Sequence, residues 1–366
     1  MGLLGKLKGD KIIWIIVLIL FAISFLLIFS CSLSIMGLIM HTIHLFFGFL
    51  LIKIVSKIPY KYFTNFSFIL FLTSVLLLVW AILTPSYVFD DFNNQIDASR
   101  WINIFGFTFQ PSELAKFSLI LLLARNLSLN KGEDFSFINS IVPIFIPILV
   151  VFLLTIKSNA STAFIIFFVS SIVLFISHFP FKQLLRFWGF SLIVFLVLFL
   201  IILPFSKQNR IQTWKNRIAS FVNPESSKNY QFDIAQKFIS SAGWFGVGAG
   251  KGSDLLPAAD SDFIYTFSIL EYGLIMGFFI LFLYLFFFQR IISISRRIKF
   301  QFPYLVVLGL GTLFVTQAFI NIGVNLGLLP TTGQTLPLLS KGGSSIWIMS
   351  LSIGIILNIS SVAYEK

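Results

Sequence analysis

Residues 12–30 read IIWIIVLILFAISFLLIFS and contain no charged side chain. An α-helix rises 1.5 Å per residue, so about 20 apolar residues cross a hydrocarbon layer that is ~30 Å thick. Nine more apolar runs of comparable length follow, at 35–55, 65–83, 112–127, 138–156, 162–179, 184–204, 263–288, 303–326 and 344–362. The sequence therefore predicts an all-α polytopic membrane protein with about ten transmembrane helices, in a single domain that covers residues 1–366.

The composition excludes several other classes. The chain is 57% hydrophobic and 11% charged, whereas soluble domains are roughly 45–50% apolar and 25% charged. The continuous runs exclude an outer-membrane barrel, whose strands alternate. The single cysteine, Cys31, excludes a disulfide framework, and His41, His44 and His178 lack the spacing of a metal motif. The net charge of +12 forms no basic stripe, so we expect no nucleic-acid partner.

Lysine and arginine predict the orientation of the chain. Lys6, Lys8 and Lys11 resemble the start of a signal peptide, but the run that follows is too long and lacks a cleavage site, so we expect an uncleaved anchor. With the N-terminus inside, the short inner segments carry 15 lysines and arginines and the short outer segments carry 4. Cytoplasmic loops carry the excess of such residues. Both termini are therefore predicted to be cytoplasmic.

Three segments fall outside the membrane in this orientation: 84–111, 205–261 and 327–343. Segment 205–261 is the large extracytoplasmic loop between spans 7 and 8, and its seven lysines and arginines suit an anionic substrate or membrane lipid headgroups. Segment 327–343 contains two prolines and four glycines, which exclude a continuous helix, yet it is too apolar for a free loop. Irregular backbone at membrane depth is tolerated only inside protein or along a cavity. We therefore expect a cavity near the outer surface.

Two charged residues stand at the start of the fourth span. Pro111, Ser112 and Glu113 favour a helix start, because proline suits the first turn and an acid suits the helix dipole. Glu113 and Lys116 are three residues apart, so they share a helix face just inside the apolar zone. Ionisable residues there are costly and are usually paired or functional. Structural pairing and substrate contact both stay open.

The glycine-rich run 243–252, GWFGVGAGKG, invites a phosphate-loop interpretation. It fails as a Walker motif, because Phe245 stands where the first glycine belongs and Gly252 replaces the Ser or Thr. What remains is a flexible external turn whose backbone could approach a ligand closely.

Asp262 is the last polar residue before the eighth span, and Glu271 lies within that span. A carboxylate at this boundary can be an N-cap or a base whose pKa is raised by desolvation. Spacing alone favours the cap.

Five motifs occur in order along the chain: RWI and QPSELAK within 100–116, YQ at 230–231, GWFGVGAG at 243–250, LP and SDFIY within 256–265 followed by Glu271, and GLLPTTGQTLPLLSKGGSS at 327–345. Together they resemble the SEDS family of FtsW, RodA and SpoVE, over essentially the whole chain. The phrase PTTGQTLPL and the pair Asn223-Pro224 are closer to the FtsW branch than to the RodA branch.

The resemblance implies a peptidoglycan glycosyltransferase. It would polymerise lipid II at the outer face of the bacterial cytoplasmic membrane, in septal cell-wall synthesis during cell division. Its partners would be a class B penicillin-binding protein, as transpeptidase, and other divisome membrane proteins. A RodA-type elongation polymerase, a lipid II flippase and a non-catalytic scaffold are the alternatives.

The resemblance also implies a site. The family's essential aspartate falls on Asp262, which replaces the cap interpretation with that of a base for the acceptor hydroxyl. The departing undecaprenyl pyrophosphate needs cationic or hydrogen-bond stabilisation, and a divalent cation, Mg²⁺ or Mn²⁺, stays open as a cofactor. The expected substrate contacts are Arg100, Gln110, Glu113, Lys116, Arg210, Gln231, Gly248, Gly250, Glu271, Pro337, Ser340, Gly342, Gly343 and Ser344.

The chain departs from the family pattern at four places. Asn159 stands where the family has the aspartate of P-D-L-G-T-A, and Leu270 precedes Glu271 where the family has paired glutamates. Lys341 replaces a tyrosine, and Asp260 replaces a histidine two residues before Asp262. A second acid at position 260 leaves two candidates for the base.

Overall fold

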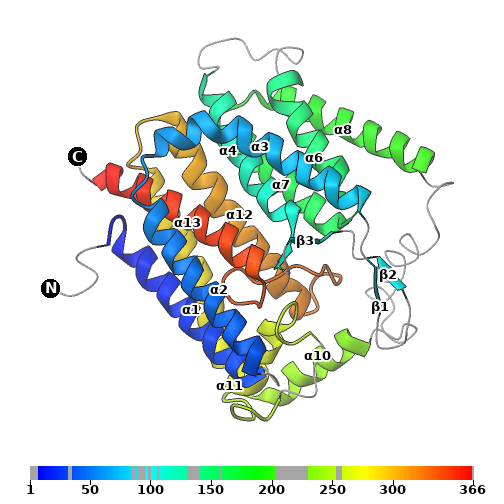
Figure 1. The fold of residues 1–366 in the computed structure, drawn as a ribbon, viewed down its shortest axis with the longest axis vertical. Coiled ribbons are helices and arrows are strands. Elements are labelled where there is room, and N and C mark those ends of the chain that lie inside the picture. The colour runs from blue at the N-terminus through cyan, green and yellow to red at the C-terminus, as the bar shows by residue number, and fades with distance from the viewer. Residues whose placement is uncertain are drawn as a thin grey trace.

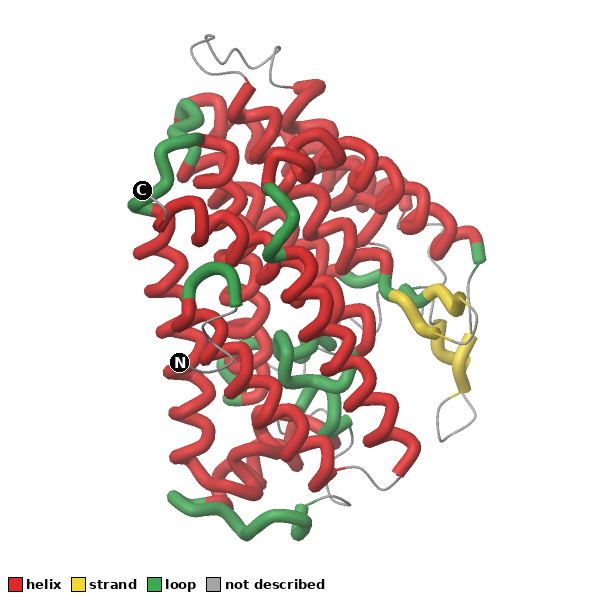
Figure 2. Tube along the Cα trace, turned by 60° about the vertical axis from the view of Figure 1, so that its left-hand side comes forward, coloured by secondary structure: helices red, strands yellow, loops and turns green. Residues whose placement is uncertain are grey.

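The computed structural model describes residues 7–31, 35–84, 87–89, 95–97, 100–104, 107–129, 141–156, 158–202, 230–252 and 258–364. Most of this part of the chain is helical, and the helices run together as a bundle (Figures 1 and 2).

Each of the ten predicted spans contains a helix. The helices are α1 (Lys11–Cys31), α2 (Ile35–Val55), α3 (Tyr60–Leu83), α4 (Pro111–Leu129), η2 (Ile141–Phe145) with α6 (Ile146–Ile156), α7 (Ala160–Ile176), α8 (Phe181–Ile202), α11 (Ile264–Ser295), α12 (Gln301–Asn325) and α13 (Gly343–Tyr364). Among the described residues, six of these helices are long and apolar enough to cross a membrane: α1, α2, α3, α11, α12 and α13. The predicted all-α polytopic fold is confirmed.

One short helix and two pairs of short strands were not predicted. Helix α10 (Tyr230–Ala242) lies within the long outer loop. Strands β1 (Tyr87–Phe89) and β2 (Gln95–Asp97) pair antiparallel, as do β3 (Ile102–Ile104) and β4 (Phe107–Phe109). Strands of three residues are too short to show a period of two in the sequence.

Helix α12 lies at the centre of the bundle, where it packs against α4, α7, α11 and α13 (Figure 1). Two glycines allow this close packing. A Cβ atom on Gly309 would lie 2.7 Å from the side chain of Ile120, and one on Gly311 would lie 2.6 Å from that of Ile291. Such distances leave no room for a larger residue.

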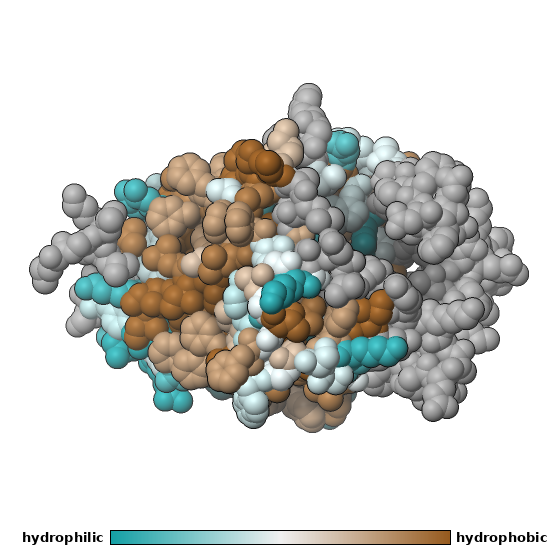
Figure 3. Space-filling model, turned by 90° about the horizontal axis from the view of Figure 1, so that it is seen from below, coloured by the Kyte–Doolittle hydropathy of each residue, from teal (hydrophilic) through white to brown (hydrophobic). Residues whose placement is uncertain are grey.

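Large apolar side chains cover much of the outer surface of the bundle. Ile35 is 81% exposed, Phe46 64% and Phe278 60%. Figure 3 shows one end of the molecule, with hydrophobic side chains massed beside smaller hydrophilic patches. A soluble monomer rarely exposes so much apolar surface, whereas a helix in lipid does.

The two ends of the described chain meet at one end of the bundle. Arg290 of α11 donates from Nε and Nη2 to Oδ2 of Asp10, at 2.8 and 2.6 Å, and the hydroxyl of Tyr364 donates to the same oxygen at 2.9 Å. Asp10 precedes α1 and Tyr364 ends α13. The start of α1 and the end of α13 therefore lie on the same side of the bundle, as an even number of spans requires.

Candidate active site

Segment 327–342 joins α12 to α13 at the opposite end and is irregular, as predicted. Leu336, Leu338 and Leu339 are each at most 1% exposed, so the segment is buried in protein. Polar side chains from three helices donate to its carbonyl groups: Asn321 to Gln334 at 2.7 Å, Tyr284 to Pro337 at 2.6 Å and Ser24 to Leu339 at 2.8 Å. These bonds satisfy backbone groups that water cannot reach.

The turn 258–263 precedes α11 and is fixed through three successive carbonyl groups. The backbone N–H of Lys341 donates to the carbonyl of Asp260 at 2.8 Å, and the hydroxyl of Ser340 donates to that of Ser261 at 2.6 Å. The amides of Asn321 and Asn325 donate to the carbonyl of Asp262 at 2.9 and 3.0 Å, respectively. The backbone that carries Asp262 is thus held by α12 and by segment 327–342.

Asp262 does not cap α11. The helix begins at Ile264 with Phe263 as its N-cap residue. Asn325 of α12 supplies the capping acceptor instead, because its Oδ1 accepts from the N–H of Thr266 at 3.0 Å and from its hydroxyl at 2.8 Å. The cap that spacing alone favoured is therefore wrong: the N-cap position is Phe263, and the side-chain acceptor comes from Asn325.

A carboxylate and a guanidinium converge on Gly333. A Cβ atom on this glycine would lie 3.5 Å from Nη1 of Arg100 and 3.6 Å from Oδ2 of Asp262. Arg100 precedes β3, whereas Gly333 belongs to segment 327–342. Both charged residues are half-buried, so a substrate can reach them. This arrangement places a carboxylate and a guanidinium around the same glycine.

Glu113 and Lys116 form a buried ion pair. The amine of Lys116 donates to Oε1 of Glu113 at 2.8 Å and to Oε1 of Gln317 at 2.7 Å, and the two charged side chains are 3% and 1% exposed. Gln317 in turn donates to the carbonyl of Thr335 at 3.2 Å. Structural pairing is therefore present, and it links α4 through α12 to segment 327–342.

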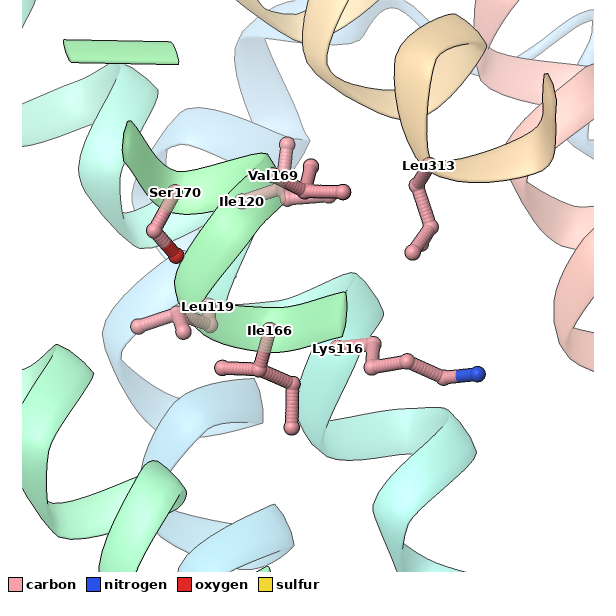
Figure 4. Close-up of a pocket in the computed structure, with 7 residues that line it drawn as sticks. All are labelled: Lys116, Leu119, Ile120, Ile166, Val169, Ser170 and Leu313. Atoms are coloured by element: carbon pink, nitrogen blue, oxygen red, sulfur yellow. The ribbon is translucent and has the colours of Figure 1, made fainter. Parts of the chain in front are cut away.

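The stem of Lys116 borders a small cavity (Figure 4). Its amine points to the side opposite Leu119 and Ser170. The cavity is about the size of one water molecule, so it is too small for a sugar. The other lining residues are Leu119, Ile120, Ile166, Val169, Ser170 and Leu313.

Gln110 and Ser344 join the starts of α4 and α13. The N–H of Gln110 donates to the hydroxyl of Ser344 at 3.3 Å, and its side-chain amide donates to Ser112 at 3.0 Å. Ser344 is 2% exposed and Gln110 is 9% exposed. These predicted contact residues therefore lie together at the base of the irregular segment.

The glycine-rich run binds α11. Helix α11 is broken at Gly273, where φ is 79° and ψ is 179°. The run replaces the lost helical hydrogen bonds on both sides of the break: Val247 N–H to Leu270 at 2.9 Å, Gly248 N–H to Glu271 at 3.0 Å, Leu274 N–H to Gly243 at 3.0 Å and Ile275 N–H to Trp244 at 3.4 Å. Its backbone thus closely approaches a helix, where the sequence suggested a ligand.

Two glycines make this approach possible. A Cβ atom on Gly246 would lie 2.3 Å from the carbonyl oxygen of Glu271, and one on Gly273 would lie 2.1 Å from that of Trp244. The side chain of Glu271 completes the junction, since its Oε1 accepts from Ser30 at 2.6 Å and from the N–H of Gly250 at 2.8 Å. Glu271 is fully buried.

The remaining predicted contact residues make few contacts that bear on the site. Arg210 and Asn223-Pro224 lie outside the described residues, and Gln231 lies in α10. Gly342 and Gly343 lie where segment 327–342 enters α13, and Gly343 faces the ring of His44. Within the described ranges, no cluster of three His, Cys, Asp or Glu side chains could hold a metal ion.

Three of the four departures from the family pattern have a structural explanation. Asn159 is the N-cap of α7, and its Oδ1 accepts from the N–H groups of Ser161 and Thr162 at 3.1 and 3.3 Å. An asparagine caps about as well as an aspartate. Lys341 and Asp260 contact each other, with Nζ 2.8 Å from Oδ2. The two changed positions are therefore one ion pair.

Sequence reasoning missed the polar face of α12. Gln317, Asn321 and Asn325 are four residues apart and at most 2% exposed, so they lie on one side of the helix. Each bonds to segment 327–342 or to the turn of Asp262. Three amides on one face of an otherwise apolar span are a readable signal for a polar interior.

Residues 10–365 match the model of the FtsW, RodA and SpoVE family, which is described as "Cell cycle protein". The chain is 31% identical to the probable peptidoglycan glycosyltransferase FtsW of Coxiella burnetii over 375 residues, which covers 96% of each chain. It is 33% identical to the protein of the same name from Nitrosomonas europaea, covering 83% of this chain and 77% of that one. The chain therefore belongs to the family of FtsW, RodA and SpoVE, and the resemblance seen in its motifs is confirmed.

Solved structures share the fold. A chain from a peptidoglycan synthase complex that coordinates polymerization and crosslinking superposes with a TM-score of 0.80 at 23% identity, covering 98% of this chain and 99% of that one. The rod shape determining protein RodA of Thermus thermophilus gives a TM-score of 0.70 at 20% identity, covering 99% and 100%.

Proposed function

We propose that the chain is a peptidoglycan glycosyltransferase that polymerises lipid II into glycan strands at the outer face of the cytoplasmic membrane. Family membership and the name of the FtsW relatives support this activity. The observation that carries it to a site is the convergence of Asp262 and Arg100 on Gly333, on a turn that α12 and segment 327–342 hold in place.

In this proposal Asp262 is the catalytic base. A sugar hydroxyl is a weak nucleophile until a positioned group takes its proton. The carboxylate accepts the proton as the hydroxyl oxygen bonds to the anomeric carbon of the donor, and the bond from that carbon to the pyrophosphate oxygen breaks. The lipid pyrophosphate leaves with both bonding electrons, and Arg100 stabilises the growing negative charge.

The remaining predicted contacts keep supporting roles. The pair of Glu113 and Lys116 holds the wall of the site through Gln317. Gln110 and Ser344, with Pro337, Ser340, Gly342 and Gly343, shape the floor beneath the head-group. Glu271, Gly248 and Gly250 keep α11 and its turn together, and substrate contact by Arg210 and Gln231 stays a prediction from the sequence.

The proposal extends to partners and place. The protein is a multi-pass membrane protein. A class B penicillin-binding protein is the expected transpeptidase partner, because a chain of the same fold works in a complex that coordinates polymerization and crosslinking. The FtsW relatives favour a septal role among divisome proteins over an elongation role. Depletion that gives filamentous cells supports the septal role, whereas rounded cells would assign the chain to elongation.

The decisive experiment is polymerisation of purified lipid II by the purified protein with its transpeptidase partner. Loss of the base in Asp262→Asn should lower the rate by about 10²–10⁴-fold, while the protein stays folded in detergent, because the hydrogen bonds to the carbonyl groups of the turn are kept. Full activity of Asp262→Asn would contradict the assignment of the base. A wild-type protein that moves lipid II between leaflets without polymerising it would contradict the activity.

A further inference from the structure

Asp260 and Lys341 tie the turn of Asp262 to segment 327–342 in two ways. Their backbones are joined by the bond from Lys341 N–H to the Asp260 carbonyl, at 2.8 Å. Their side chains form an ion pair, with 2.8 Å between Nζ and Oδ2. The other contacts that fix the turn, from Ser340 and the α12 amides, are between neutral groups.

The pair is half-exposed, since the side chains of Lys341 and Asp260 are 39% and 34% exposed. Exposed ion pairs contribute little to folding stability. The pair is therefore poorly explained as a device that keeps the protein folded, and its position beside the proposed base is the feature to explain.

Electrostatics gives that explanation. Asp260 and Asp262 are two residues apart on one turn, and an unpaired carboxylate near a second one disfavours ionisation of both. Lys341 neutralises Asp260 and occupies its Oδ2. The carboxylate of Asp262 and the guanidinium of Arg100 both approach Gly333.

We propose that Asp260 and Lys341 are a positioning pair for the proposed base: the pair keeps Asp260 from acting as a competing acid and holds the turn so that the carboxylate of Asp262 stays ionised and aimed at the acceptor. The inference rests on the proposed glycosyltransferase activity. It also gives Asp260 a role other than that of the base, because its carboxylate is paired with Lys341.

The test compares Asp260→Asn, Lys341→Gln, the double variant and the charge-swapped pair Asp260→Lys with Lys341→Asp in the lipid II polymerisation assay. Misplacement of a catalytic group by about 1 Å can cost 10²-fold, so we expect each single variant to lower kcat by about tenfold with little change in KM. The swapped pair should recover to within about threefold of the parent rate, because it restores an ion pair between positions 260 and 341. The single and double variants together form a double-mutant cycle, which measures the coupling of the two groups.

The pH–rate profile separates electrostatic positioning from a merely structural role. Lys341→Gln leaves Asp260 unpaired beside Asp262, so the acid limb of the profile should move to higher pH. Asp260→Asn removes the second charge, so its acid limb should stay in place. Lys182→Gln, an exposed lysine at the start of α8 and outside the proposed site, is the matched control and should change neither the rate nor the profile.

A second measurement is independent of activity. Hydrogen–deuterium exchange over residues 258–263 should be faster in Lys341→Gln than in the parent protein and should return to the parent rate in the swapped pair. If the wild type fails to polymerise lipid II, the proposed function fails, and exchange still tests whether the pair holds the turn. Additive effects of the two single variants, or a swapped pair no better than they are, would overturn the positioning pair.

Discussion

The two turns that border α11 are built in opposite ways. The glycine-rich turn 243–252 is held mainly by backbone bonded to backbone, and its closest contacts, at Gly246 and Gly273, exclude any side chain. The turn 258–263 is held mainly by side chains that donate to its carbonyl groups, and Asp262 stays half-buried. The glycines of the first turn therefore allow its backbone to supply the hydrogen bonds that α11 lacks at its break. The amides around the second turn hold the backbone of a candidate catalytic residue in place.

The largest expected effect tests the first turn. Gly246→Ala would place a Cβ atom 2.3 Å from the carbonyl oxygen of Glu271, at a φ of 74°. Overpacking and backbone strain together should cost about 3 kcal/mol or more of the free energy of unfolding, measured by thermal unfolding in detergent.

Gly243→Ala is the matched control for that variant. Its φ is also positive, at 61°, but no atom lies within 4 Å of the added Cβ. It should cost only about 1 kcal/mol, from backbone conformation alone. Equal losses in the two variants would mean that close packing on α11 is not what requires glycine. If Gly246→Ala had normal stability but a raised KM, the result would support ligand binding by the glycine-rich turn instead.

A smaller effect tests the second turn. Asn325→Leu removes the donor to the Asp262 carbonyl and the acceptor for Thr266, leaving buried polar groups that cost about 1–3 kcal/mol. Because Asn325 positions the turn, the polymerisation rate per folded molecule should also fall, by about tenfold or more.

Asn358→Leu separates stability from function. Asn358 is a buried amide at the other end of the bundle, where it donates to the Ser56 carbonyl at 2.8 Å and accepts from the N–H of Tyr60 at 3.1 Å. Its loss should cost a similar free energy of unfolding without changing the rate per folded molecule. Similar rates for the two variants would contradict the special role of the second turn.

The sequence predicted much of this architecture, because long apolar runs leave few alternatives to membrane helices. The prolines and glycines of segment 327–343 also predicted irregular buried backbone. The role of the glycine-rich turn could not be predicted, since it depends on the break at Gly273, which lies in another element. Local spacing alone favours Asp262 as the cap of α11 for a similar reason. The acceptor that replaced it, Asn325, comes from the far end of the next helix, and local spacing carries no record of it.

The smallest expected effect concerns neither turn and appears only in acid. Burial opposes ionisation of Asp10, but hydrogen bonds from Arg290, from the N–H of Ile13 and from Tyr364 outweigh it and hold the pKa of this carboxyl below its ordinary value. The pKa of Asp10 is lower in the folded protein than in the unfolded chain. The contact of Asp10 with Arg290 and Tyr364 therefore stabilises the protein fully above the ordinary pKa of about 3.9, and this stabilisation is lost as the pH falls through the folded-state pKa. The unfolding temperature of the wild type should therefore fall more below about pH 4 than that of Asp10→Asn. An identical acid response of both proteins would show that the contact between the chain ends adds no pH-dependent stability. A polymerisation rate at neutral pH that falls in Asp10→Asn would show instead that the two ends of the bundle are coupled.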